Sequence, residues 1–190
     1  MPSLFVIAGC NGAGKTTASY TLLPEVLGID EFVNADEIAR GLSPFNPESV
    51  AIEAGRLMLK RIHDLIDKRA DFAIETTLAT RSYRPLFLDA IKKGYTVQFI
   101  FVWLASPQIA FERVQERVKH GGHFIPYDIL ERRYYRGLKN FFEHYMPLGN
   151  WRILNNTTDF PEVVAIAEGA GISIFDKATF NEIKRIASGT

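Results

Sequence analysis

Residues 4–17 read LFVIAGCNGAGKTT, an apolar run followed by a glycine-rich loop and then a lysine with two threonines. The part from Gly9 to Thr16 fits the pattern G-x-x-x-x-G-K-[ST], which binds nucleotide phosphates. Its glycines let the backbone turn tightly and bring N–H groups to phosphate oxygens, and a following helix points its positive end at the same anion. The apolar run and a helical pattern over Lys15–Leu23 supply the required strand–loop–helix context. The sequence therefore predicts a phosphate-binding loop.

The residues of this loop carry distinct expected roles. Lys15 should reach the β- and γ-phosphates, and the hydroxyl of Thr16 should ligate Mg²⁺. The predicted nucleotide contacts are Gly9, Asn11, Gly12, Ala13, Gly14, Lys15, Thr16 and Thr17. Together they indicate an enzyme or switch that handles a nucleoside triphosphate.

Composition narrows the class of protein. The chain has 190 residues, 47% hydrophobic and 23% charged, which is typical of one globular domain. It has 22 Lys plus Arg and 22 Asp plus Glu, so its formal net charge is zero. A zero net charge argues against a nucleic acid or a membrane surface as the main partner. We see no signal-peptide pattern and no run of 18 apolar residues. A cytoplasmic location is therefore expected.

Cys10 is the only cysteine, so no intrachain disulfide is expected, which suits a reducing compartment. A helix N-terminus lowers the pKa of a nearby thiol, so this position could be reactive. The alternative, which we favour, is that Cys10 is simply a small residue that fits the loop.

Apolar, strand-forming runs alternate with helical patterns along the chain. The runs are Leu4–Ala8, Glu31–Asn34, Phe72–Glu75, Val97–Leu104 and Trp151–Leu154. They lack strict alternation of apolar and polar residues, as expected for strands buried on both faces. The pattern predicts an α/β fold with a mainly parallel sheet.

Helix signals lie between the runs. Asn46-Pro47 is typical of an N-cap and a first-turn proline, and predicts a helix to about Arg69. Its expected apolar face consists of Val50, Ala54, Leu57, Met58, Ile62, Leu65 and Ile66. Further helices are predicted over 84–93, from Ser106 to before Gly121, and over 126–145.

The C-terminal region predicts a β-hairpin followed by a helix. Its strands would be Val163–Ala167 and Ile172–Phe175, although the first could also be helical. Asp176 is expected to cap the last helix.

Asp36 lies just beyond the predicted strand Glu31–Asn34, where ligands of parallel sheets bind. A carboxylate there can face the γ-phosphate and accept the proton of an acceptor hydroxyl. Asp36 is therefore the candidate general base. The alternative is a helix N-cap, and the two roles are compatible.

Glu75 ends another predicted strand and is followed by Thr76. An acid at the tip of a buried strand is expected to have a partner, because burying an unpaired charge is costly. We predict that Glu75 and Thr76 bind substrate, and that Glu75 could hold Mg²⁺ through water; the alternative is a solvated strand end. Arg81 could bind a substrate phosphate or be a surface arginine.

The segment 113–136 predicts a closing lid. Two helical patterns flank the glycines Gly121 and Gly122 and carry Arg113, Arg117, Lys119, Arg132, Arg133 and Arg136. Such arginines can neutralise charge on a moving phosphoryl group and exclude water. We name Arg117, Arg132 and Arg133 as catalytic candidates, although each could instead form a salt bridge on a helix surface.

His120 and His123 lie near the glycines but lack the partners of a metal site. A hydrogen bond from His123 to substrate or to the loop backbone is the better interpretation.

Taken together, these motifs resemble the zeta-toxin-like P-loop kinases, in particular their compact bacterial branch. The resemblance rests on the loop 9–17, on residues 34–39 (NADEIA), 74–77 (IETT) and 117–123 (RVKHGGH), and on Pro126 and 132–134 (RRY). These motifs cover residues 4 to about 140 in the order expected for that family.

The resemblance implies a P-loop NTPase fold of the adenylate-kinase-like, three-layer type, with a five-stranded, mainly parallel sheet of order 2-3-1-4-5 and a single domain over 1–190. It also implies transfer of the γ-phosphoryl group of ATP to a hydroxyl of a small-molecule acceptor. In the characterised zeta toxins the acceptor is UDP-N-acetylglucosamine at its 3′-hydroxyl, and a small antitoxin blocks the ATP site. Asp36 then matches the general base, Glu75 the substrate-binding acid, and Arg117 with Arg132 or Arg133 the lid arginines.

Two other functions stay open at this point. A nucleotide-hydrolysing switch would need no small-molecule acceptor, although the guanine signature N-K-x-D and a strand ending in Asp-Glu are both absent from the sequence. A nucleotide-dependent binding module could use the basic residues of 113–136, for instance toward RNA. The zero net charge disfavours that interpretation.

Overall fold

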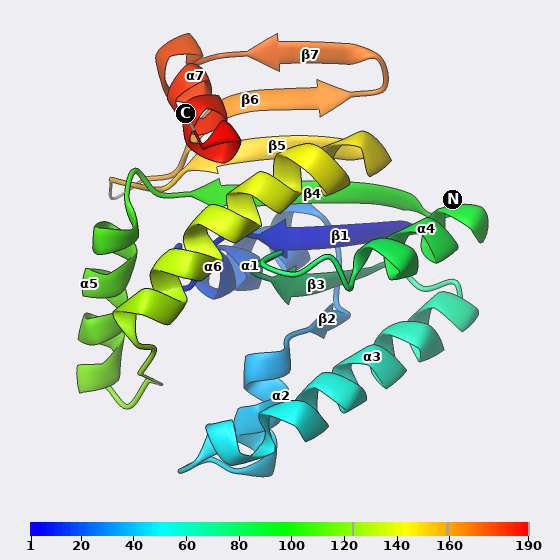
Figure 1. Cartoon of the computed structure of the whole chain (residues 1–190). Helices are drawn as coiled ribbons and strands as arrows, with labels where there is room; N and C mark the ends of the chain where they lie inside the picture. Colours follow the sequence, from blue (N-terminus) through cyan, green and yellow to red (C-terminus); the bar gives the residue numbers. More distant parts are fainter. Residues whose placement is uncertain (123, 159, 190) are drawn as a thin grey trace.

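A seven-stranded sheet forms the centre of the computed structural model, which describes residues 1–122, 124–158 and 160–189 (Figure 1). The strands are β1 (Ser3–Ala8), β2 (Phe32–Val33), β3 (Phe72–Thr76), β4 (Thr96–Trp103), β5 (Asn150–Asn155), β6 (Glu162–Glu168) and β7 (Gly171–Ile174). The helices are α1 (Lys15–Thr21), α2 (Ala35–Leu42), α3 (Ala51–Asp67), α4 (Arg84–Lys92), α5 (Pro107–Lys119), α6 (Tyr127–Asn140) and α7 (Lys177–Ser188). None of the helices in the described ranges has the length and apolar character needed to cross a membrane.

The strands lie in the order β2-β3-β1-β4-β5-β6-β7. Strands β1 to β5 pair in parallel, whereas β6 pairs antiparallel with β5 and with β7. The predicted five-stranded order 2-3-1-4-5 is therefore confirmed. The predicted hairpin is also confirmed, and it extends the sheet beyond β5.

Both faces of the sheet are covered, which explains why the strand sequences do not alternate. In β1, Leu4 and Val6 enter a large core beneath α3, α4, α6 and α7, while Phe5 and Ile7 enter a smaller core with Leu23. These four residues are each at most 7% exposed. Helix α1 lies behind the sheet in Figure 1, and α4, α6 and α7 lie in front, giving the predicted three layers.

The parallel strands end at one edge of the sheet, where α5 lies (Figure 1). The phosphate-binding loop follows β1, residues 34–36 follow β2, and residues 77–80 follow β3. Helices α2 and α3 pack against each other and project beyond β2 at the bottom of Figure 1. The topology therefore brings all three loops to one place.

Asp176 is confirmed as the cap of the last helix, and Ser106, predicted only as a helix start, also caps its helix. Ser106 accepts a hydrogen bond from the N–H of Ile109 at 3.3 Å, and Asp176 accepts one from Thr179 at 3.0 Å. Asn46 lies at the predicted N-cap position with Pro47 in the first turn, but its side chain makes no capping hydrogen bond, so that prediction is confirmed only in part. The chain after Asn46 first forms a short 3₁₀ turn, Pro47–Val50, whose tighter geometry moves the cap away from the α-helix.

The predicted apolar face of α3 is confirmed apart from its edge. Ala54, Met58, Ile62, Leu65 and Ile66 are buried, but Leu57 is 40% exposed, and Val50 is only half-buried and lies in the 3₁₀ turn before the helix. A helix that packs on one layer buries only the stripe facing that layer, and Leu57 lies at its margin.

Candidate active site

The phosphate-binding loop has the backbone conformation for which its glycines are required. Gly12 and Gly14 have φ values of 81° and 86°, in the left-handed region that favours glycine. A Cβ atom on Gly12 would lie 2.3 Å from the carbonyl oxygen of Ala110 on α5. The glycine at this position is therefore needed both for the turn and for the close packing of α5.

We predict that Gly12→Ala lowers the free energy of unfolding by about 3 kcal/mol, since it adds both backbone strain and a clash with the backbone of Ala110. Gly28→Ala is the matched control, because Gly28 has a φ of 64° but a Cβ atom added there would meet, apart from its chain neighbours, no atom of the described residues within 4 Å. That control should lose only about 1 kcal/mol. Urea denaturation of both variants measures the difference, and equal losses would contradict the packing argument.

The loop after β5 holds the phosphate-binding loop from the side. Asn156 donates a hydrogen bond from Nδ2 to the carbonyl oxygen of Ala13 at 2.7 Å. Arg113 on α5 donates to the carbonyl oxygens of Asn156 and Thr157 at 2.8 and 3.2 Å. The guanidinium of Arg113 therefore ties α5 to the loop after β5, which in turn fixes the phosphate-binding loop.

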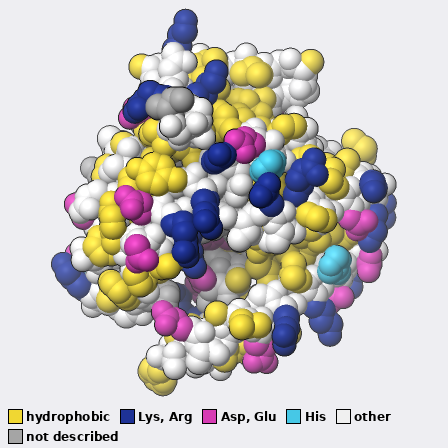
Figure 2. All heavy atoms as spheres, viewed as in Figure 1, with side chains coloured by type: hydrophobic (Ala, Val, Ile, Leu, Met, Phe, Trp, Pro, Cys, Tyr) yellow, Lys and Arg dark blue, Asp and Glu magenta, His cyan; other side chains and the backbone are white. Residues whose placement is uncertain are grey.

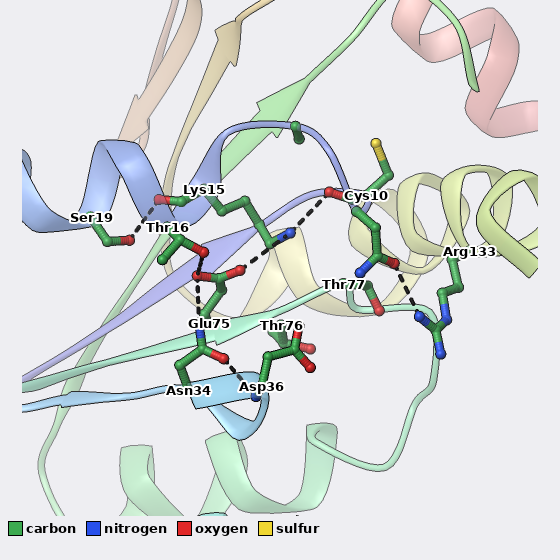
Figure 3. Close-up of polar contacts among 12 residues, drawn as sticks. Cys10, Lys15, Thr16, Ser19, Asn34, Asp36, Glu75, Thr76, Thr77 and Arg133 are labelled. Carbon is green, nitrogen blue, oxygen red and sulfur yellow. Dashed lines mark hydrogen bonds and ion pairs between the residues drawn. The ribbon is translucent and has the colours of Figure 1, made fainter. Parts of the chain in front are cut away.

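Lys15 and Thr16 both contact Glu75, so the structure brings these three candidate site residues together (Figure 3). The Nζ atom of Lys15 lies 3.4 Å from Oε1 of Glu75 and donates to the carbonyl oxygen of Cys10 at 2.9 Å. The Thr16 hydroxyl donates to Oε2 of Glu75 at 2.8 Å. The side chains of Lys15 and Glu75 are only 6% and 10% exposed, so this ion pair is shielded from water. Glu75 is therefore not the solvated strand end of the alternative interpretation.

Asp36 lies at the start of α2 but does not cap it. The N-cap is Asn34, whose Oδ1 accepts the N–H of Asp36 at 2.8 Å. Asn34 also donates from Nδ2 to Oε2 of Glu75 at 2.9 Å. The capping alternative for Asp36 is therefore wrong, and its exposed carboxylate is left to face the cavities described below.

Helix α6 fixes the loop that follows β3. A Cβ atom on Gly137 would lie 2.4 Å from the carbonyl oxygen of Thr77. Asn140 donates to the carbonyl oxygen of Leu78 at 2.8 Å, and the hydroxyl of Tyr145, in the π-helical turn Phe141–Tyr145 that follows α6, donates to that of Thr80 at 2.7 Å. The helix that carries Arg133 thus also sets the position of the loop beside Glu75.

Three connected cavities meet at this edge of the sheet, and all three include Asn11 and Asp36 in their walls. We call them the phosphate cavity (320 Å³), the hydroxyl cavity (320 Å³) and the lid cavity (330 Å³). Figure 2 shows the molecule hollowed between the projecting lower lobe and the main body, with Lys and Arg side chains just above the hollow. A ligand with phosphates and a second ligand could therefore meet at Asp36.

The three cavities are lined by side chains of different chemical character. The phosphate cavity is lined by Gly12, Gly14, Lys15, Thr16, Thr17, Glu75, Arg113 and Arg117. The hydroxyl cavity is lined by Glu75, Thr76, Thr77, Thr80, Ser82, Tyr83 and Arg133. Burial raises the pKa of Tyr83, so its phenol stays protonated at neutral pH. The lid cavity is more apolar, with Phe124, Ile125, Pro126 and Ile129 beside Arg40, Arg117 and Arg133.

The predicted arginines divide into two that line the cavities and two that do not. Arg133 donates to Oδ1 of Asn11 in the phosphate-binding loop at 3.1 Å (Figure 3), and Arg117 lines the phosphate and lid cavities. Arg132 and Arg81 are exposed and are not among the described residues that line the three cavities. His123, expected to contact substrate, lies outside the described residues.

Sequence reasoning overlooked Asn34 and Asn156 as site residues. The sequence motifs include Asn34 without a role for it, and Asn156 belongs to none of them. Both residues follow the carboxyl ends of parallel strands, where ligands bind, so their positions after the predicted strands could have identified them as site residues.

Cys10 is buried, and burial raises the pKa of its thiol to about 11 despite the nearby charge of Lys15. At pH 8 only about one molecule in 1,000 then carries the reactive thiolate. We expect a thiol reagent such as DTNB to label the folded protein at least about 100-fold more slowly than the protein in guanidinium chloride. Fast labelling of the folded protein would instead support the reactive interpretation.

Oxygen atoms suited to Mg²⁺ lie at the phosphate cavity. Thr16 Oγ1 and Glu75 Oε2 are adjacent, and hydroxyl and carboxylate oxygens are the ligands this ion takes. Within 1–122, 124–158 and 160–189, no group of three His, Cys, Asp or Glu side chains could hold a metal ion by itself. These residues fit a Mg²⁺ ion that is bound mainly by nucleotide phosphates and water.

The sequence and the fold both match known proteins. The family model described as Zeta toxin matches residues 1–178. A relative from Haemophilus influenzae, named only "Uncharacterized protein", is 32% identical over 126 residues, which are 66% of this chain and 88% of the relative.

Among solved structures, the AvrRxo1-ORF1:AvrRxo1-ORF2 complex with sulphate ions superposes with a TM-score of 0.79 at 18% identity, covering 96% of this chain and 63% of that chain. The same complex solved with ATP gives a TM-score of 0.76. A structure of the PezAT chromosomal toxin–antitoxin system of Streptococcus pneumoniae gives 0.73 at 16% identity, covering 100% of this chain and 80% of that one. The present chain thus spans less than two thirds of the AvrRxo1 chain, and at these identities the likeness concerns the fold.

Proposed function

This chain belongs to the zeta toxin family, and we propose that it is an ATP-dependent kinase that transfers the γ-phosphoryl group to a hydroxyl of a small-molecule acceptor. The observation that carries the proposal is the position of Asp36, an exposed carboxylate in the walls of both the phosphate cavity and the hydroxyl cavity. A pure ATPase would need no second, hydroxyl-lined cavity at that carboxylate.

The phosphate cavity supplies the donor site. We infer that backbone N–H groups from Gly12 to Thr16 bind the phosphates of ATP and that Lys15 leaves Glu75 to reach the β- and γ-phosphates. Mg²⁺, held at Thr16 and through water at Glu75, would neutralise charge on those phosphates. The ATP complex of AvrRxo1, which has this fold, supports a nucleotide at the loop.

Asp36 is the proposed general base. Its carboxylate accepts the proton of the acceptor hydroxyl while the hydroxyl oxygen forms a bond to the γ-phosphorus, and the bond from that phosphorus to ADP breaks. Arg133 and Arg117 would stabilise the charge on the phosphoryl group during transfer. These roles use only residues that line the meeting point of the cavities.

The hydroxyl cavity supplies the proposed acceptor site. Thr77, Thr80, Ser82 and Tyr83 offer hydroxyl groups, and Glu75 offers a carboxylate, which together suit a ligand rich in hydroxyls such as a sugar. Membership of the zeta toxin family supports a UDP-sugar, and UDP-N-acetylglucosamine in particular, as the first acceptor to test.

A coupled ADP-release assay with Mg-ATP tests the proposal, run across UDP-sugars, nucleosides, nucleotides and small polyols. We expect ADP release that depends on one acceptor class and a phosphorylated product that mass spectrometry detects. ADP release without any acceptor would instead support a nucleotide-hydrolysing switch. ATP binding without turnover would support a binding module.

An antitoxin protein is the proposed partner. The PezAT structure comes from a toxin–antitoxin system, and this chain shares its fold. A small protein that covers the phosphate cavity would block both ATP and the lid arginines. Competition between such a protein and ATP, measured by calorimetry, tests this part of the proposal.

A further inference from the structure

Asn34 is a buried polar residue, 6% exposed, between β2 and α2. Its side-chain amide makes two hydrogen bonds in different directions (Figure 3). Oδ1 accepts the backbone N–H of Asp36 at 2.8 Å, and Nδ2 donates to Oε2 of Glu75 at 2.9 Å. One side chain therefore joins the two acidic residues that line the phosphate and hydroxyl cavities.

The other partners of Glu75 are the residues that a nucleotide would take. Lys15 lies 3.4 Å from Oε1, and Thr16 donates to Oε2 at 2.8 Å. Phosphates draw away the ammonium group of a P-loop lysine, and Mg²⁺ draws away the hydroxyl. The amide of Asn34 carries no charge and does not belong to the phosphate-binding loop, so the nucleotide does not compete for it. A carboxylate only 10% exposed needs a retained donor, because an unsatisfied buried charge is costly.

We propose that Asn34 is a positioning residue that holds Glu75 in place when nucleotide withdraws Lys15 and Thr16, and so keeps Glu75 in register with Asp36. The inference rests on the proposed function, because it takes Mg-nucleotide as the ligand that displaces Lys15 and Thr16. Asn34 touches neither reacting atom in this scheme and acts through Glu75.

The competing explanation is that Asn34 is only the N-cap of α2. The two roles need different atoms, so they can be separated. Serine, aspartate and asparagine are about equally good N-caps, but an aspartate carboxylate has no hydrogen to donate, and the serine hydroxyl is one bond shorter than the asparagine amide. Asn34→Asp therefore keeps the cap and removes the donor, and Asn34→Ser keeps the cap and moves its donor one bond away from Glu75. Asn34→Asp also keeps the side-chain volume, and its carboxylate repels Glu75.

The experiment measures the binding of the fluorescent nucleotide mant-ATP with and without Mg²⁺. In the wild-type protein Mg²⁺ should tighten binding, and Glu75→Gln should reduce that enhancement. We expect Asn34→Ser and Asn34→Asp each to reduce it by about tenfold, as for loss of a hydrogen bond to a charged group. In the double variant, Asn34→Ser should add nothing to Glu75→Gln. Asn46→Ser is the matched control, because Asn46 precedes the turn Pro47–Val50 but makes no capping bond there.

Three results would overturn the inference. They are a wild-type level of enhancement in both Asn34 variants, a loss in the double variant equal to the product of the single losses, and no enhancement by Mg²⁺ in the wild-type protein. Failure of the kinase proposal looks different, because the wild-type protein would then bind mant-ATP with the enhancement but transfer phosphate to no acceptor. In that case the binding data still decide the role of Asn34.

Discussion

Replacing Asp36 by asparagine should reduce phosphoryl transfer by about 10²–10⁴-fold, the contribution typical of a positioned general base. The amide has nearly the same size as the carboxylate but does not take up the acceptor proton. Nucleotide binding should persist, because the described contacts of the phosphate-binding loop run through Lys15, Thr16 and Glu75 rather than through Asp36. Parallel measurements of kcat and of the Kd for mant-ATP test both parts.

The fold should tolerate this change. Asn34 caps α2, so Asp36→Asn removes only a first-turn carboxylate that contributes at most about 1 kcal/mol through the helix dipole. Glu53→Gln is a matched control, because Glu53 is the exposed acid in the first turn of α3 and does not line the cavities described here. Transfer at the wild-type rate by Asp36→Asn would remove Asp36 as the base. Loss of nucleotide binding would show that Asp36 acts on the donor side instead.

The features predicted from sequence are those that residues close together in the chain determine. The phosphate-binding loop requires glycines at fixed spacing, buried parallel strands require continuous apolar runs, and the cap at Asp176 needs an acceptor within three residues of the N–H group that it binds. The parallel strand ends then place Asp36 and Glu75 in one site, as the topology rule predicts.

The features that sequence did not predict depend on contacts between distant residues. Asn156 binds Ala13 across 143 positions, and Asn140 binds Leu78 across 62. Single-sequence periodicity carries no information on such pairs, because each partner is an ordinary loop or helix residue by composition. The sequence left the choice between Arg132 and Arg133 open for the same reason. Adjacent helical positions point about 100° apart, and only the packing of α6 decides which one faces the loop.

Replacing Arg133 by alanine should lower kcat by about 10³-fold or more, as for other arginines that stabilise a transferring phosphoryl group. Arg133 is the α6 arginine that reaches the phosphate-binding loop, through the 3.1 Å hydrogen bond to Asn11, and it lines the hydroxyl and lid cavities. Arg133→Lys should recover only part of the rate, because an ammonium group lacks the planar fork of donors. The Kd for mant-ATP should rise far less than kcat falls, since Lys15 and the loop backbone remain.

Arg132→Ala decides whether the effect belongs to this one position. Arg132 is the preceding residue of α6, has the same charge and is exposed, so its loss should change kcat by less than about threefold. Lys139→Ala controls for a change of net charge on α6, because Lys139 is exposed and forms a surface pair with Glu143. Equal losses from Arg132→Ala and Arg133→Ala would mean that the positive field of α6, rather than the contact at Asn11, drives transfer. A large loss from Arg132→Ala alone would mean that α6 turns when ATP binds and presents the other arginine to the phosphates.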